Sequence, residues 1–170
     1  MAVTNGAGAG LVLTGSETTV DVLKCVVKEC GRIGMYVDQG ATVTATQCEF
    51  LENGADGVFC AGANNTICAG ANTKARLNDC KIHNNRRDGL NAYGQAVVDL
   101  HGTKTDIHSN KRHGIHASDR AKVNINLHSQ HNTTHDNVRA NRHQERDGSI
   151  ANINADGTFT HVVVEEDDDH

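Results

Sequence analysis

The sequence predicts a single right-handed parallel β-helix, a solenoid of about six coils. Three observations predict this all-β fold class. Glycines recur at a nearly constant interval, apolar residues form columns when the sequence is aligned on those glycines, and the columns lie two residues apart. Two residues is the period at which side chains return to the same face of a β-strand. In a solenoid, equivalent residues of successive coils stack, so columns carry the pattern.

The repeat is defined by six glycines whose separations are 24, 23, 32, 25 and 34 residues. They are Gly10, Gly34, Gly57, Gly89, Gly114 and Gly148. A coil of 23 to 25 residues with two insertions of roughly nine residues accounts for these separations. The first insertion lies at about 61–72, where CAGAN occurs twice, and the second at 128–147. The second segment has almost no apolar residues, so we expect a long exposed loop.

The columns separate inward from outward positions. Three of them are apolar or small, and one is polar. The first column holds Cys25, Cys48, Cys80 and Thr105, and the second holds Val27, Phe50, Ile82 and Ile107. The third column holds Val20, Val43, Ala75 and Leu100. The polar column holds Asp21, Thr44, Arg76 and His101. We expect the first three to line the core and the fourth to face solvent.

A turn column precedes the repeated glycine by four residues and holds Cys30, Asn53, Asn85 and Asn110. Asparagine tolerates the left-handed backbone region, and its amide can hydrogen-bond to an equivalent amide one coil above and below. We therefore expect an asparagine ladder that fixes the register of the coils.

Length and composition favour one domain over residues 1–164. Aromatic residues make up 3%, and proline and tryptophan are absent, which suits thin layers of short strands. Residues 149–164 flank Asp156 and Gly157, a strong hairpin signal. The hairpin or the solenoid ends could also pair with a second copy. Residues 165–170 form an acidic tail that we expect to be disordered.

Charge and hydropathy limit the partners. The net charge is −5, but the acidic excess lies largely in the tail, so neither nucleic acid nor a membrane surface is an expected partner. We find no signal peptide and no stretch of about 20 apolar residues, and we expect a soluble protein. The cytoplasm is slightly favoured, because most of the six cysteines are expected to be reduced. Only Cys60 and Cys68, which flank the duplicated segment, are considered as a disulfide pair.

Two motifs are similar to those of the right-handed parallel β-helix superfamily, which includes pectate lyases, polygalacturonases and phage tailspikes. They are N-x-x-x-G-[ILV]-x-[AVC], as in 53–60, 85–92 and 110–117, and C-x-[FI]-x-x-N, as in 48–53 and 80–85. The resemblance covers about residues 10–127, extends more loosely to 150–164, and implies the fold. It does not select a function, because the superfamily contains lyases, hydrolases, carbohydrate binders and protein-recognition scaffolds.

The resemblance implies a substrate cleft along one face of the solenoid, for which Asp56 and Asp88 are the best catalytic pair. Both precede the repeated glycine by one residue, in neighbouring coils. Glycoside hydrolases need two carboxyl groups. Aspartate before glycine is also an ordinary turn residue, and outside the acidic tail the N-T-D, D-D, G-H-G and R-I-K motifs of polygalacturonases are absent.

Two further columns are candidates for binding a polymer. Arg32, Arg87 and Arg112 share one position and would form a basic ridge able to bind carboxylate or sulfate groups. The outward column of Tyr36, Phe59, Asn91 and His116 offers aromatic faces for sugar rings or a protein partner. Both columns also have an explanation that needs no ligand. The arginines would then be solvated residues at the corners of the coils, and the aromatic side chains would pack against each other across strands.

Eleven histidines raise the possibility of a metal site. The repeat positions of His108, His113 and His116 separate these residues, so we expect only His128, His131 and His135, in the long loop, to be able to gather. We expect no cofactor. The sequence thus favours a non-catalytic scaffold or recognition module for a carbohydrate polymer or a protein, and the alternative is a lyase or glycoside hydrolase acting on an acidic polysaccharide.

Overall fold

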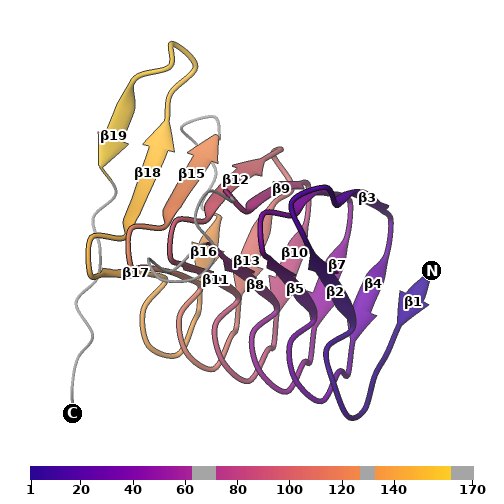
Figure 1. Cartoon of the computed structure of the whole chain (residues 1–170). Coiled ribbons are helices and arrows are strands. Elements are labelled where there is room, and N and C mark those ends of the chain that lie inside the picture. The colour runs from indigo at the N-terminus through magenta and orange to yellow at the C-terminus, as the bar shows by residue number, and fades with distance from the viewer. Residues whose placement is uncertain (63–71, 127–132, 162–170) are drawn as a thin grey trace.

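Three sheets wind around one core (Figure 1) in a computed structural model that describes residues 1–62, 72–126 and 133–161. Sheet A contains β1 (Ala2–Val3), β4 (Val26–Lys28), β7 (Glu49–Leu51), β10 (Lys81–His83), β13 (Asp106–His108) and β16 (Thr134–His135). Sheet B contains β2 (Leu11–Thr14), β5 (Met35–Asp38), β8 (Val58–Ala61), β11 (Leu90–Tyr93), β14 (Ile115–Ser118) and β17 (Arg142–Glu145). Sheet C contains β3 (Thr19–Leu23), β6 (Thr42–Thr46), β9 (Lys74–Asn78), β12 (Val97–His101), β15 (Lys122–Asn126), β18 (Ser149–Ile153) and β19 (Phe159–His161).

The chain passes from sheet A to sheet B to sheet C and then returns to sheet A one level further along. Each strand pairs in parallel with its equivalents in the neighbouring levels, and only β18 and β19 pair antiparallel. The described residues form six such levels, here called rungs, so the chain makes about five turns from the first rung to the sixth. The predicted solenoid is confirmed. Among the described residues, no helix has the length and hydrophobicity needed to cross a membrane.

The core is the stack of inward columns, and the predicted columns are largely confirmed. Val27, Phe50, Ile82 and Ile107 pair in register and are fully buried. One part of the prediction was wrong by two residues in the fourth rung. Val98, not Leu100, follows Ala75, and Asp99, not His101, follows Arg76. The turn between β12 and β13 is two residues longer than the turn between β6 and β7, so an offset counted back from the next repeated glycine could not follow it.

The asparagine ladder is confirmed and extends one rung further than predicted. Asn53 Nδ2 donates to Asn85 Oδ1 at 2.9 Å, Asn85 Nδ2 to Asn110 Oδ1 at 2.9 Å, and Asn110 Nδ2 to Asn137 Oδ1 at 3.0 Å. The asparagines themselves do not occupy the left-handed region. That conformation belongs to the residue just before each position of the turn column, which holds Cys30 and the four asparagines; these residues are Glu29, Glu52, Asn84, Ser109 and Asp136, with φ between 52° and 56°.

The predicted loop at 128–147 was wrong. Residues 127–132 lie outside the described part, but 133–147 form the first two strands of the sixth rung, β16 and β17. Asn141, not Gly148, takes the position of the repeated glycine, because Ile115 pairs with Arg142. Polar outward residues and a polar end rung made this segment resemble a loop. The hairpin that follows is confirmed for residues 149–161, and the first insertion, residues 63–71, lies outside the described part.

The cysteine file is also confirmed. Cys25, Cys48 and Cys80 lie in one buried column and are free thiols. Cys48 Sγ donates to the carbonyl oxygen of Val22, and Cys80 Sγ to that of Ala45, each one rung below. Cys60 is likewise a buried free thiol, and Cys68, considered as its disulfide partner, lies outside the described part.

Candidate metal centre

The candidate site lies on the outer face of sheet B, close to the corner where each rung enters that sheet. The cross-strand register aligns one outward residue from each rung. This outward column, in rung order, is Val12, Tyr36, Phe59, Asn91, His116 and His143. Its character changes along the solenoid from apolar through aromatic to imidazole, and the candidate centre lies at the imidazole end.

Two buried aspartates, Asp56 and Asp88, lie at this corner in neighbouring rungs, next to the site. Asp56 Oδ1 accepts the backbone N–H of Asp88 at 3.0 Å, and Asp88 Oδ1 accepts the backbone N–H of His113 at 3.0 Å. The two carboxylates therefore continue a corner column and are both buried. The predicted juxtaposition of Asp56 and Asp88 is observed, and Asp88 is the member that faces the histidines.

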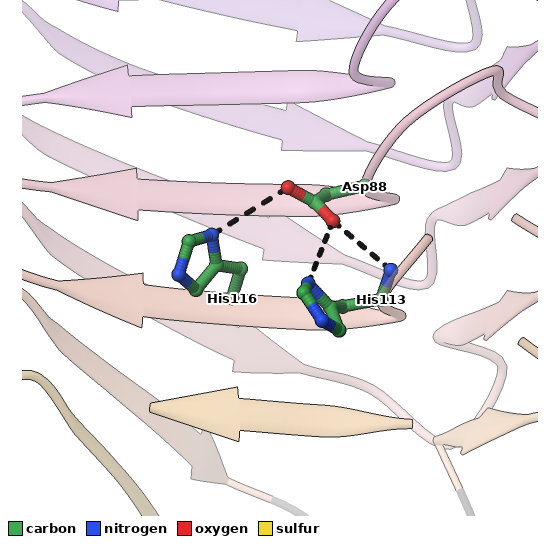
Figure 2. A group of neighbouring side chains, drawn as sticks. All are labelled: Asp88, His113 and His116. Atoms are coloured by element: carbon green, nitrogen blue, oxygen red, sulfur yellow. Dashed lines mark hydrogen bonds and ion pairs between the residues drawn. The ribbon is translucent and has the colours of Figure 1, made fainter. Parts of the chain in front are cut away.

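Figure 2 shows how Asp88, His113 and His116 converge. His113 Nδ1 lies 3.0 Å from Asp88 Oδ1, and His116 Nδ1 lies 3.5 Å from Asp88 Oδ2. All three side chains are buried, with His116 only 6% exposed. Neither ring nitrogen of His116 has a hydrogen-bond partner among the described residues, although each lies near a carboxylate. A buried imidazole without such partners is unusual, because buried polar atoms are nearly always hydrogen-bonded.

The local electrostatics keep Asp88 ionised. Burial raises the pKa of this carboxyl, but its close contacts with His113 and His116 outweigh burial and hold the pKa well below its usual range. Asp56 behaves in the opposite way, since burial and then the negative charge of Asp88 raise its pKa to about 6. The anionic ligand of the group is thus available at neutral pH.

A second group adjoins the first through His116. Glu145 Oε1 lies 3.4 Å from His116 Nε2, the ring nitrogen that points away from Asp88. His143 pairs with His116 across β14 and β17, and its ring lies 4.5 Å from that of His113 in a parallel stack. In each group, Asp88/His113/His116 and His116/His143/Glu145, the potential ligand atoms lie within 4.8 Å of one another.

These side chains are the ligands that transition metals prefer. Two imidazoles and one carboxylate form a common site for Zn²⁺ and related cations. Ligand atoms about 2.1 Å from a tetrahedral ion lie about 3.4 Å from one another. The distances of 3.0 and 3.5 Å from Asp88 to the two imidazoles are close to that value. A cation would leave at least one coordination position for another ligand.

One comparison with known proteins matches part of the scaffold. The family model for the right-handed β-helix region matches residues 2–73. The chain is a right-handed parallel β-helix. The match covers β1 to β8, and the later strands of the β-helix continue the same three sheets in register. Comparison with curated proteins and with solved structures gave no match. Because this fold is compatible with scaffolding, binding and enzymatic roles, the site must carry the functional argument.

The arginine column of the β-helix has the predicted stacking. A backbone hydrogen-bond ladder joins Arg32 to Ala55, Ala55 to Arg87, Arg87 to Arg112 and Arg112 to Arg139. Arg32 and Arg87 are exposed, and Arg112 is half-buried with its Nη1 atom 3.7 Å from Asp88 Oδ2. The ridge therefore borders the candidate centre. Its sixth-rung member, Arg139, was missed because the segment was assigned to a loop.

The predicted aromatic column divides into two parts. Tyr36 and Phe59 stack with ring centroids 5.5 Å apart and an interplanar angle of 3°, and both are half-buried. Asn91 and His116 are instead buried. Asn91 Nδ2 donates to Asp56 and Asp88, each at 3.5 Å. Of these four predicted residues, only Tyr36 and Phe59 remain partly exposed.

The histidines predicted for metal binding do not lie at this site. His128 and His131 fall outside the described residues. His135 lies on the outer face of sheet A, where its ring stacks on that of His108, which in turn stacks on that of His83. The separation predicted for His113 and His116 was wrong. The chain turns a corner at Gly114, and this corner brings both the His113 ring before it and the His116 ring after it to the carboxylate of Asp88. His143 and Glu145 were missed together with the sixth rung.

The histidine stack on sheet A predicts a pH effect. Burial lowers the pKa of His108 from its ordinary value of 6.5, so the unfolded chain binds a proton at this ring first as the pH falls through 6.5. His108 therefore reduces the stability of the fold on acidification. We expect His108→Gln to lose less stability than the wild type between pH 8 and pH 5, as measured by urea denaturation in EDTA.

His135 provides a control of opposite sign. Its hydrogen bond with Asp136 raises the pKa, so this ring adds stability as the pH falls and loses that contribution as the pH rises through the folded-state pKa. His135→Gln should lose more stability on acidification than the wild type. Equal slopes for both variants would contradict this account of the stack.

Proposed function

We propose that this β-helix is a metal-binding scaffold that holds a divalent transition-metal cation between Asp88, His113 and His116. The observation that carries the proposal is the convergence of two imidazoles on one buried carboxylate, with both nitrogens of His116 lacking a hydrogen-bond partner among the described residues. A cation would supply the missing partner and offset the cost of burying the Asp88 charge.

The ligand set favours the imidazole-binding metals over Ca²⁺ and Mg²⁺. Calcium and magnesium sites are built from oxygen ligands, whereas zinc, copper and nickel bind imidazole well. The rigid register of β11 and β14 fixes the spacing between Asp88 and the two histidines, so little ordering would accompany binding. Asn91, which donates to Asp88 Oδ2, would help to orient the carboxylate.

Equilibrium dialysis of the full chain against Zn²⁺ tests the proposal. We expect His116→Gln to weaken binding at least about 100-fold, since even residues that only orient ligands contribute 10- to 100-fold. His108→Gln is the matched control, because His108 lies on sheet A and belongs to neither group of potential ligands. Zn²⁺ affinity that is absent in the wild type, or equal in the wild type and His116→Gln, would refute the proposal.

A second candidate function is recognition of an acidic polysaccharide along the same face. The coplanar Tyr36–Phe59 pair favours it, because ring faces stack on sugars. The stacked Arg32, Arg87 and Arg112 could bind carboxylate or sulfate groups. The geometry favours binding over hydrolysis, since Asp56 and Asp88 are buried and each accepts a backbone N–H from the next rung.

Affinity electrophoresis on pectate, alginate and a sulfated polymer tests this candidate. We expect retardation of the wild type, reduced about tenfold in Tyr36→Ala through loss of one ring-stacking contact. Arg87→Gln should also reduce it, whereas exposed Arg86→Gln serves as the control for loss of charge. Release of unsaturated products or reducing ends, abolished by Asp88→Asn, would instead show the lyase or hydrolase alternative.

A further inference from the structure

We infer that His116 bridges two cations, the second of which is held by its Nε2 atom together with His143 and Glu145. This inference rests on the proposed function and concerns the same site. His116 lies between two carboxylates, with Nδ1 3.5 Å from Asp88 Oδ2 and Nε2 3.4 Å from Glu145 Oε1. One ring therefore belongs to both groups of potential ligands.

The protonation states of imidazole support two cations. A neutral imidazole has one N–H donor and one lone pair, and a carboxylate can only accept. With a carboxylate on each side, a neutral His116 would direct its lone pair at an acceptor oxygen. A doubly protonated ring could donate to both, but neither nitrogen makes a hydrogen bond among the described residues. A cation on each side satisfies both nitrogens and both carboxylates.

The stacking of the rungs places a third imidazole, that of His143, beside both His116 and His113. His143 follows His116 in the outward column, and the two ring centroids lie 5.2 Å apart. The corresponding distance from His116 to His113 is 5.3 Å. His116 thus lies beside two imidazole–carboxylate pairs, namely His113 of its own rung with Asp88 of the rung before, and His143 with Glu145 of the rung after.

The second cation requires a defined proton transfer. With the first cation on Nδ1, the neutral ring keeps a proton on Nε2. Binding of the second cation breaks the Nε2–H bond and forms an Nε2–metal bond, and the proton passes to bulk solvent. The ring becomes an imidazolate, and no electron is transferred. Cu²⁺ is the strongest probe, since it heads the affinity order for nitrogen sites.

A Cu²⁺ titration followed by electron paramagnetic resonance tests the bridge on the full chain. The first equivalent should give the signal of an isolated Cu²⁺ ion. The second should lower the signal per copper, because an imidazolate bridge couples the two unpaired spins antiferromagnetically. Proton release on the second equivalent, measured in weak buffer with an indicator dye, should accompany the loss of signal.

Variants separate the bridge from the first site. Glu145→Gln should bind one Cu²⁺ at this face, keep the first affinity within about threefold, and show no loss of signal with further copper. Glu145 has a 44% exposed side chain, so its replacement should leave the fold intact. His135→Gln, on sheet A, is the control and should behave as the wild type.

The other outcomes are distinct. One Cu²⁺ per chain, bound more weakly in Glu145→Gln, would assign Glu145 as a hydrogen-bond acceptor for Nε2–H and overturn the bridge while keeping the first site. Two uncoupled Cu²⁺ signals would overturn it as well. Absence of Cu²⁺ and Zn²⁺ binding that depends on His116 would remove the proposed function itself.

Discussion

Replacing Phe50 with alanine is expected to lower the free energy of unfolding by about 3–5 kcal/mol. Phe50 is the largest of the fully buried side chains, and it lies between Val27 and Ile82 in the inward column of sheet A. The stacked backbones hold the rungs at a fixed spacing, so the cavity cannot close by sliding one rung along another.

Phe159→Ala is the matched control, because Phe159 is 67% exposed on β19. Urea denaturation followed by far-ultraviolet circular dichroism measures both variants. The control should change the unfolding free energy by less than about 1 kcal/mol. Similar losses for Phe50→Ala and Phe159→Ala would mean that stability does not depend on the stacked core.

The second large effect is expected for Gly89→Ala, which should cost at least about 3 kcal/mol. A Cβ atom at this position would lie 2.6 Å from Asn110 Nδ2 and 2.8 Å from the carbonyl oxygen of Gly114. The latter is backbone of the next rung, so the rungs would have to separate. That separation would also stretch the buried amide ladder, whose atoms have no solvent to replace lost partners.

Gly6→Ala provides the comparison for Gly89→Ala. No atom lies within 4 Å of the Cβ position at Gly6, and its φ is not in the left-handed region. We expect a change of a few tenths of a kcal/mol, toward greater stability, since alanine restricts the unfolded chain. Thermal denaturation distinguishes the two variants. Equal midpoints would show that the repeated glycines are not required by close packing.

The fold could be predicted from the sequence because stacking repeats the same constraint in every rung. Gly34, Gly57, Gly89 and Gly114 recur because each lies against an asparagine amide and a backbone oxygen of the next rung. The sixth rung could not be recognised in the same way. Asn141 replaces the glycine there, and Arg142, His143 and Gln144 replace the alternating apolar pattern of sheet B.

The site was only partly predictable. Repeat positions placed Asp56 beside Asp88, because parallel strands align equivalent residues. They did not bring His113 and His116 together, since a repeat position gives the rung and the face but not the distance across a corner. The chain turns a corner between His113 and β14, which brings the two rings close together. Both rings contact Asp88 from the rung that follows it.

The left-handed residues, which include those before the asparagine ladder, affect how the solenoid unfolds. Thirteen non-glycine residues have positive φ in the part of the chain that the structure describes. Each carries a conformational cost of about 1 kcal/mol, so the total is comparable with the whole stability of an ordinary domain. The hydrogen bonds and packing between stacked rungs must offset this conformational cost. A rung that lost its neighbours would therefore unfold first at these positive-φ residues.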